Sequence, residues 1–182
     1  MGSEMCIRDS LSSMENMETL TAREADTWAR MWACHMQLPI TLDATLKRDA
    51  DVTYFEFQAM LKISESPNAS RRMTDLSEAT AMSLSHLSRV ITRLEKKGFV
   101  ARIPDPNDGR ATFAALTPAG QRAVQAGHPG YIEELRRIFF DNLTDSELEV
   151  FSSALERINA ALAGETTPSA RNRAELTATG AA

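Results

Sequence analysis

Residues 85–100 of the chain read SHLSRVITRLEKKGFV, and this stretch decides the fold. Its apolar side chains recur at the spacing of a buried helix face: Leu87, Val90, Ile91 and Leu94. Ser83 can cap the start of this helix, while Lys96 and Lys97 suit its negative end and Gly98 supplies a left-handed cap. The stretch therefore predicts an amphipathic helix with a basic outer face.

The neighbours of this helix complete a known supersecondary pattern. Before it, Thr74 can cap a short helix that ends near Thr80, and two helices joined so tightly predict a helix-turn-helix. After it, residues 99–103 favour a strand, residues 104–109 (PDPNDG) favour a turn, and residues 111–116 favour a return strand. A hairpin directly after the second helix is the "wing" of a winged helix.

Further helices are predicted on both sides of this lobe. Residues 21–48 favour a helix that Pro39 should end or kink, and residues 54–64 favour a second one, followed by a loop at 66–70. Pro118 can begin another helix, which residues 127–130 (GHPG) should kink or interrupt before residues 131–140 resume it.

A last helix is predicted near the end of the chain. A capping box at residues 144–147 opens it, and its apolar positions form an approximate heptad suited to pairing with another helix: Leu148, Phe151, Leu155, Ile158 and Leu162.

Composition and charge bound the function without fixing it. The 182 residues carry a net charge of −5, but residues 71–110 hold eight basic and five acidic side chains. An acidic protein with a local basic element can bind nucleic acid, although a solvated helix face would show the same charges. The chain has no run of 18 apolar residues and no signal-peptide core, so we expect a cytoplasmic protein that does not engage a membrane.

Four motifs together give a family resemblance. They are LSEA at 76–79, the stretch at 85–100, DPNDGRA at 105–111 and LTPAG at 116–120. This combination resembles the MarR family of bacterial transcription regulators, most strongly over residues 76–120 and loosely from Trp28 to Leu162. The resemblance implies a mainly α fold with a small β-hairpin wing, in which a winged helix-turn-helix is flanked by N- and C-terminal dimerisation helices.

The resemblance also implies the organisation of the chain: an N-terminal dimerisation helix at 14–51, the DNA-binding lobe at 52–126 and C-terminal dimerisation helices at 127–163. From the residues themselves we expect a non-native or disordered leader at 1–13, and a disordered tail at 164–182, which is rich in Thr, Ala and polar groups without periodicity. The partners would be double-stranded DNA, a second copy of the chain and a small-molecule effector.

Polar side chains of the 85–97 helix are the candidates for DNA contacts, because an α-helix fits the major groove. These are Ser85, His86, Ser88, Arg89, Thr92 and Arg93. Arg89 can bond a guanine through two donors. By the resemblance, Arg110 would enter the minor groove and Asp108 would orient it. We interpret Arg71, Arg72, Lys96 and Lys97 as phosphate contacts or simple solvated charges.

Aromatic and methionine side chains on the first two helices can line an effector pocket: Trp28, Trp32, His35, Met36, Phe57 and Met60. The same pattern is more typical of a core or a dimer interface. Cys34 and the scattered histidines give no confident redox or metal site, so we expect no metal and no cofactor.

The sequence favours a repressor-type DNA-binding regulator over an enzyme, because it holds no phosphate loop, metal-ligand spacing or nucleophile beside a base. We therefore name no catalytic residue. The alternative is a winged-helix module for protein assembly. An assembly surface would be apolar over residues 85–97, whereas the side chains predicted to be exposed there are polar or basic.

Overall fold

The computed structural model describes residues 20–105, 108 and 111–164. The predicted leader at 1–13 and nearly all of the predicted tail lie outside these residues, as does Arg110. The chain divides into two units, one up to Gly127 and one from His128 onward. The division falls inside helix α6, and each unit is described by itself below.

Helix α2 (Ala22–Ala50) opens the first unit. Thr21 and Glu24 form a capping box at its start. The prediction that Pro39 could end this helix is wrong, because α2 continues through it. A proline removes one backbone hydrogen bond at a finite cost of about 3 kcal/mol, and the good helix formers on both sides outweigh it.

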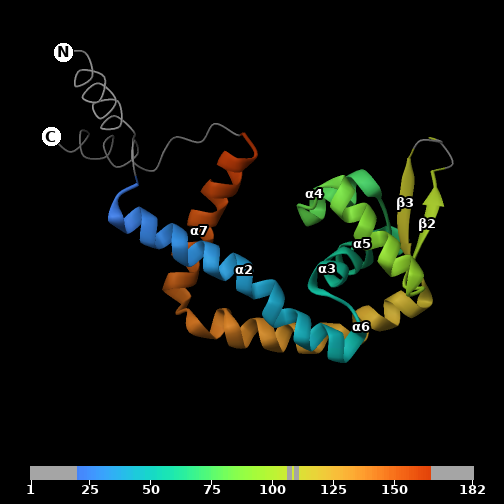
Figure 1. Cartoon of the computed structure of the whole chain (residues 1–182), viewed down its shortest axis with the longest axis horizontal. Coiled ribbons are helices and arrows are strands. Elements are labelled where there is room, and N and C mark those ends of the chain that lie inside the picture. The colour runs from blue at the N-terminus through green and yellow to red at the C-terminus, as the bar shows by residue number, and fades with distance from the viewer. Residues whose placement is uncertain (1–19, 106–107, 109–110, 165–182) are drawn as a thin grey trace, which may run out of the picture. The chain divides into compact units, whose positions relative to one another are not determined.

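Helices α3 (Tyr54–Ser64), α4 (Met73–Thr80) and α5 (Leu84–Lys96) build the lobe of the first unit, and Figure 1 shows them grouped beside the strands. The predicted apolar stripe of α5 is confirmed, because Leu87, Val90, Ile91 and Leu94 are all fully buried. They meet a core from the other helices: Phe57, Met60, Ile63 and Leu76, with Leu42 and Leu46 of α2 also fully buried.

The residues predicted to cap the two ends of α5 are confirmed. The Ser83 hydroxyl accepts the His86 N–H at 3.3 Å, and Gly98 follows the helix with a left-handed φ of 72°. The cap predicted for α4 is wrong. Its N-cap is Arg72, whose side chain makes no capping hydrogen bond, while the Thr74 hydroxyl donates to Asp75 at 3.0 Å.

The strands form a small antiparallel sheet in the order β1-β3-β2. The wing hairpin consists of β2 (Val100–Pro104) and β3 (Thr112–Leu116), paired from Val100 opposite Leu116. This hairpin was predicted. The third strand, β1 (Ser70–Arg72), was not: it follows the short 3-10 helix η1 (Pro67–Ala69), where the sequence predicted only a loop.

The LTPAG motif joins the sheet to helix α6 (Pro118–Ile138). The Thr117 hydroxyl donates to Gly98 O at 2.6 Å and accepts the Gly120 N–H at 3.1 Å, and Thr117 N donates to Phe99 O at 3.0 Å. Gly120 lies so close to this backbone that a Cβ on it would stand 2.0 Å from Phe99 O. The motif therefore has a structural reason, which is a close crossing of the two backbones.

The interruption predicted at residues 127–130 is wrong, because α6 continues through Pro129 to Ile138. In the second unit the 3-10 helix η2 (Phe140–Asn142) follows, and then α7 (Asp145–Leu162), which begins with the predicted capping box of Thr144 and Glu147. The apolar side chains of α7 are 37–81% exposed in the single chain: Leu148, Val150, Phe151, Leu155, Ile158 and Leu162. No described helix is long and apolar enough to cross a membrane.

Candidate nucleic-acid interface

The outer face of α5 carries two of the predicted DNA contacts in an accessible position. Ser85 and Arg89 are both exposed. In the part of the chain that the structure describes, Arg89 makes no hydrogen bond or ion pair, and the Ser85 hydroxyl meets only that of Ser83, at 3.2 Å. Arg89 therefore keeps all five of its N–H donors available for a ligand.

Ser88 and Thr92, also predicted to contact DNA, are bonded to the wing, and their contacts with DNA stay predictions. Arg102 of β2 donates through Nη2 to Ser88 O at 3.0 Å and Ser88 Oγ at 3.3 Å. Its Nη1 and Nη2 each lie 3.3 Å from Thr92 Oγ1, and Nη1 forms an ion pair with Glu95. No role was predicted for Arg102 from the sequence, because a contact between a strand and the preceding helix leaves no periodic signal.

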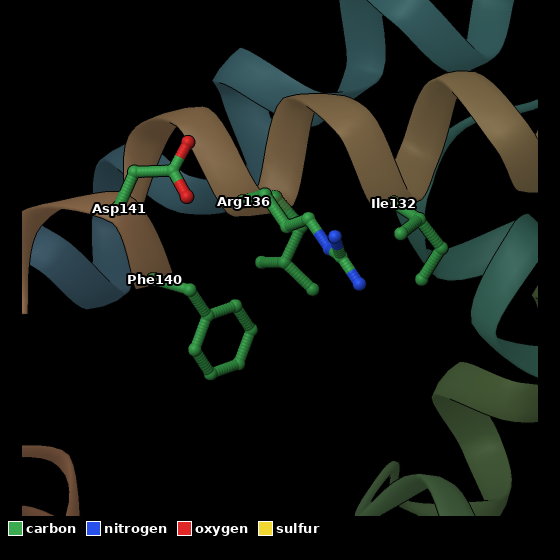
Figure 2. A pocket seen from close by; sticks show the side chains of 5 residues that line it. Ile132, Arg136, Phe140 and Asp141 are labelled. Atoms are coloured by element: carbon green, nitrogen blue, oxygen red, sulfur yellow. The ribbon is translucent and has the colours of Figure 1, made fainter. Parts of the chain in front are cut away.

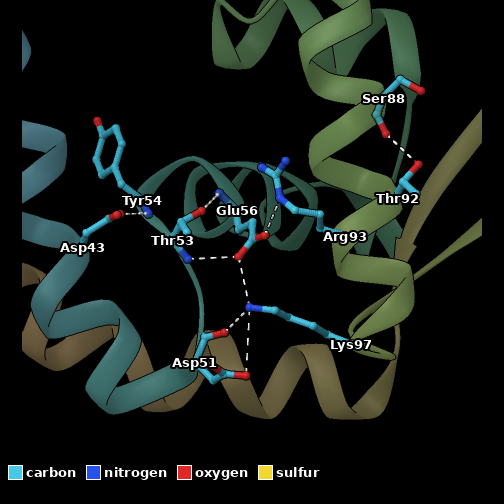
Figure 3. Close-up of polar contacts among 9 residues, drawn as sticks. All are labelled: Asp43, Asp51, Thr53, Tyr54, Glu56, Ser88, Thr92, Arg93 and Lys97. Carbon is cyan, nitrogen blue, oxygen red and sulfur yellow. Dashed lines mark hydrogen bonds and ion pairs between the residues drawn. The ribbon is translucent and has the colours of Figure 1, made fainter.

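Arg93 and Lys97 are held from the other side of α5 by a buried carboxylate (Figure 3). Glu56 of α3 has a side chain that is only 2% exposed. It accepts Arg93 Nε at 2.9 Å and Lys97 Nζ at 3.2 Å, and the Thr53 N–H at 3.0 Å as part of the α3 capping box. Lys97 also donates to Asp51 O. Lys97 is therefore an ion-pair partner of Glu56 rather than a simple solvated charge, and its contact with phosphate stays a prediction.

These contacts set the charge of Glu56. Burial is the largest single influence and raises its pKa, but the bonds from Thr53, Arg93 and Lys97 together lower the pKa below its ordinary value. Glu56 is therefore an anion at neutral pH, and it fixes two basic side chains of the α5 region in place.

Arg72 is also paired within the lobe. It forms an ion pair with Asp105, whose side chain is 2% exposed, and its guanidinium lies 5.6 Å from the Phe113 ring centroid. The basic residues of the described part of 71–105 thus fall into two groups. Four have acidic partners, namely Arg72, Arg93, Lys97 and Arg102, and three have none among the described residues, namely Arg71, Arg89 and Lys96.

The remaining predicted DNA contacts have different positions. The His86 ring packs edge-on against Phe55 with centroids 5.2 Å apart, so its imidazole is partly covered. Asp108 is exposed in the wing turn, where its carbonyl accepts the Ala111 N–H at 2.9 Å. Arg110 lies outside the described residues, so the predicted pair of Asp108 and Arg110 stays a prediction.

The residues predicted to line an effector pocket divide into two environments. Phe57 and Met60 are fully buried in the lobe core. Trp28, Trp32 and Met36 are 49–57% exposed on α2, where His35 is also exposed and lies 5.8 Å from Trp32 between ring centroids. Cys34 is exposed as well, rather than buried. The six residues therefore do not share one environment in the single chain, and their ligand role stays a prediction.

A pocket of about 430 Å³ lies in the second unit, where no site was predicted (Figure 2). Ile132, Leu135 and Arg136 of α6 line it together with Phe140 and Asp141 of η2. Among the described residues, no group of His, Cys, Asp or Glu side chains could hold a metal ion. The outer face of α5 therefore remains the best defined candidate site.

Known proteins that are similar to this chain match it over the helices and wing of this lobe. The model of the MarR family matches residues 52–112. The uncharacterized HTH-type transcriptional regulator YxaD of Bacillus subtilis is 28% identical over 122 residues, which cover 67% of this chain and 83% of YxaD. The multiple antibiotic resistance protein MarR of Salmonella typhimurium is 31% identical over 84 residues, which cover 46% of this chain and 58% of that protein.

Two solved structures from Streptomyces coelicolor match nearly over their full length. Sco3205, a MarR family transcriptional regulator in complex with DNA, is 31% identical with a TM-score of 0.76, covering 84% of this chain and 94% of that chain. AbsC, also a MarR family transcriptional regulator, is 31% identical with a TM-score of 0.76, covering 81% of this chain and 99% of that chain. The chain therefore belongs to the MarR family and is a winged-helix transcriptional regulator rather than an enzyme.

Proposed function

We propose that this protein represses transcription as a homodimer that binds an inverted-repeat operator in double-stranded DNA. The observation that carries the proposal is Arg89, a guanidinium on the exposed face of α5 that has no partner among the described residues. A free guanidinium on a helix that fits the major groove suits the N7 and O6 acceptors of guanine. The DNA in the Sco3205 structure supports the same class of ligand.

The second copy is proposed from the apolar faces that the single chain leaves open. Trp28, Met31 and Trp32 on α2 are 45–57% exposed, and the large apolar side chains of α7 are 37–81% exposed. A helix face that exposes several large apolar side chains typically marks a protein interface. A two-fold dimer presents two copies of α5, so its half-sites should lie about one helical turn apart, roughly 10 base pairs between centres.

Duplexes selected by the protein from a random-sequence library test this proposal, because they need no knowledge of the regulated gene. Selection should return an inverted repeat. Arg89→Ala should weaken binding to the selected duplex by at least about 30-fold and relax preference at one base pair of each half-site, because a bidentate contact of about 1–3 kcal/mol is lost in both half-sites. Arg23→Ala, an equal loss of charge at the exposed start of α2, is the matched control and should leave binding unchanged.

Failure to select any duplex would overturn the DNA-binding proposal and favour a protein-assembly role for the lobe. Selection of a single asymmetric half-site would overturn the two-fold operator alone. An equal loss from Arg89→Ala on selected and scrambled duplexes would show that Arg89 contacts phosphate and reads no base.

A response of DNA binding to a small-molecule effector is the other part of the proposal. It rests on the exposed aromatic face of α2, and on an arginine beside an aromatic ring in the pocket of Ile132, Arg136 and Phe140. A guanidinium and an aromatic ring together suit an aromatic carboxylate. Release of the selected duplex by benzoate or salicylate, abolished in Arg136→Gln, would support that pocket, and release that survives Arg136→Gln would exclude it.

A further inference from the structure

Among the described residues of the wing strands β2 and β3, Arg102 alone has a side chain that hydrogen-bonds to α5, and it bonds three residues there. Ser88, Thr92 and Glu95 lie four and three positions apart, which places them along one face of the helix. One guanidinium thus spans two turns of α5. The side chains of Arg102 and Glu95 are each covered to about two-thirds, with 31% and 29% exposed.

This arrangement has two consequences for the charged and polar groups. The positive charge of Arg102 is already balanced by Glu95, and both of its terminal nitrogens donate to oxygens of α5. The hydroxyl oxygens of Ser88 and Thr92 accept hydrogen bonds from Arg102, and Thr92 Oγ1 also donates to Ser88 O at 2.9 Å. The two terminal nitrogens of Arg102 and the Thr92 hydroxyl therefore cannot donate to DNA without giving up a bond inside the lobe, whereas the Ser88 hydroxyl keeps its own O–H available.

We propose that Arg102 is a positioning residue for DNA recognition, which fixes the wing hairpin against α5 so that both elements present a rigid surface. It does not contact phosphate. The inference rests on the proposed function, since positioning has meaning only if the lobe binds DNA. It assigns base reading on α5 to Ser85 and Arg89, and phosphate contact to Arg71 and Lys96, which have no partner among the described residues.

The competing interpretation is that Arg102 is one more phosphate contact in a basic stretch. The two roles differ in how binding depends on salt. Each phosphate neutralised adds about −0.9 to the slope of log affinity against log salt, so loss of one contact in both protomers lowers the slope by about 1.8. A positioning residue leaves the slope unchanged, because no counterion is released on its account. It changes instead the ratio of specific to non-specific affinity.

The experiment measures fluorescence anisotropy of two duplexes over a series of salt concentrations. One duplex is that selected by the wild-type protein from a random library, and the other is its scrambled sequence. The variants are Arg102→Ala, Arg102→Lys and Lys96→Ala, with circular dichroism to establish that each is folded. Lys96→Ala is the matched comparison, because Lys96 is an exposed cation of α5 without a partner among the described residues.

For Arg102→Ala we expect a loss of about tenfold on the selected duplex, little change on the scrambled one and an unaltered salt slope, as loss of hydrogen bonds to a charged group would give. Arg102→Lys should recover only part of the loss, because one ammonium cannot reach Glu95 and Ser88 together. Lys96→Ala should weaken both duplexes equally and lower the slope. If Arg102→Ala behaves like Lys96→Ala, or changes nothing, the inference is wrong.

Glu95→Gln keeps the shape of the side chain and removes its charge. The positioning role and the phosphate-contact role predict different changes in DNA affinity for this variant. Removal of an anion beside the DNA surface would by itself tighten binding to every duplex. Since Glu95 holds Arg102, positioning predicts instead that the ratio of specific to scrambled affinity falls, by about threefold to tenfold. An unchanged ratio with tighter binding to both duplexes would overturn the inference. If the wild-type protein selects no duplex at all, the proposed function fails before this inference is reached.

Discussion

The Glu56 carboxylate on α3 accepts Arg93 Nε of α5 at 2.9 Å, although the two residues are 37 positions apart in the chain. The same carboxylate accepts Lys97 Nζ at 3.2 Å. It therefore binds two basic side chains at the C-terminal end of α5. Arg102 holds the helix from the wing. The orientation of α5 thus depends on two ion-pair clusters on different sides of it.

Glu56→Ala should lower the free energy of unfolding by about 2 kcal/mol, because it removes a buried ion pair and half of a capping box. Arg93 and Lys97 would then turn to solvent, since 49% and 30% of their side chains are already exposed, so the loss stays below that of a fully buried pair. Urea unfolding at a fixed protomer concentration measures it. A change below about 0.5 kcal/mol would contradict the proposed role of the pair.

Glu56→Gln should also change how the stability of the protein depends on pH. Its pKa is depressed in the folded protein from the ordinary value of 4.5, so its contribution is present above pH 4.5 and is lost as the pH falls through the folded pKa. Glu56→Gln removes that titration. The difference in stability between wild type and Glu56→Gln should therefore shrink as the pH is lowered from about 6 to about 3.5. A constant difference over this range would contradict the depressed pKa.

Gly120→Ala should destabilise the protein by about 1–3 kcal/mol, because the new Cβ would stand 2.0 Å from Phe99 O and the backbones would have to part. Helix propensity alone predicts the opposite sign, a gain of about 1 kcal/mol. Ala126→Gly on the exposed side of α6 is a control that measures the propensity effect in the same helix. Stabilisation by Gly120→Ala would show that the crossing is looser than the structure has it.

Ile158→Asp should convert the dimer into a monomer, because it places a charge on the apolar face of α7 that we propose to be covered by the second copy. Asn159→Asp introduces the same charge at the neighbouring exposed position and should leave the dimer intact. Light scattering at micromolar concentration distinguishes the two. A wild-type monomer, or equal dissociation by both variants, would contradict the proposed interface.

The periodic parts of the fold could be predicted from the sequence. The stripe from Leu87 to Leu94, the Ser83 cap and the wing hairpin each depend on residues near one another in the chain, and all are confirmed. Strand β1 was missed because three residues show no alternation, and it exists only through pairing with β3, more than 40 positions away. Pro39 and Pro129 were wrongly predicted to end or interrupt their helices. Each proline destabilises the helix only locally, and α2 and α6 are long enough to continue through it.

The candidate site was predicted by residue type and only partly by role. The sequence placed Arg89 and Ser85 on an open helix face, and the structure has them there. It could not separate the paired basic residues from the free ones, since Arg93 with Glu56 and Arg72 with Asp105 each join distant segments. Ser88 and Thr92 were assigned to DNA because nothing local indicated that Arg102 would bond them.

Both tryptophans of the chain, Trp28 and Trp32, lie on the exposed part of α2 and none lies in the winged-helix lobe. Intrinsic tryptophan emission of this protein therefore reports the surroundings of one helix face. Its spectrum should shift to shorter wavelength when that face is covered and should respond weakly to melting of the lobe itself. A denaturation curve recorded by fluorescence would then describe a different event from one recorded by far-ultraviolet circular dichroism, and a mismatch between the two would be a property of the probe's location.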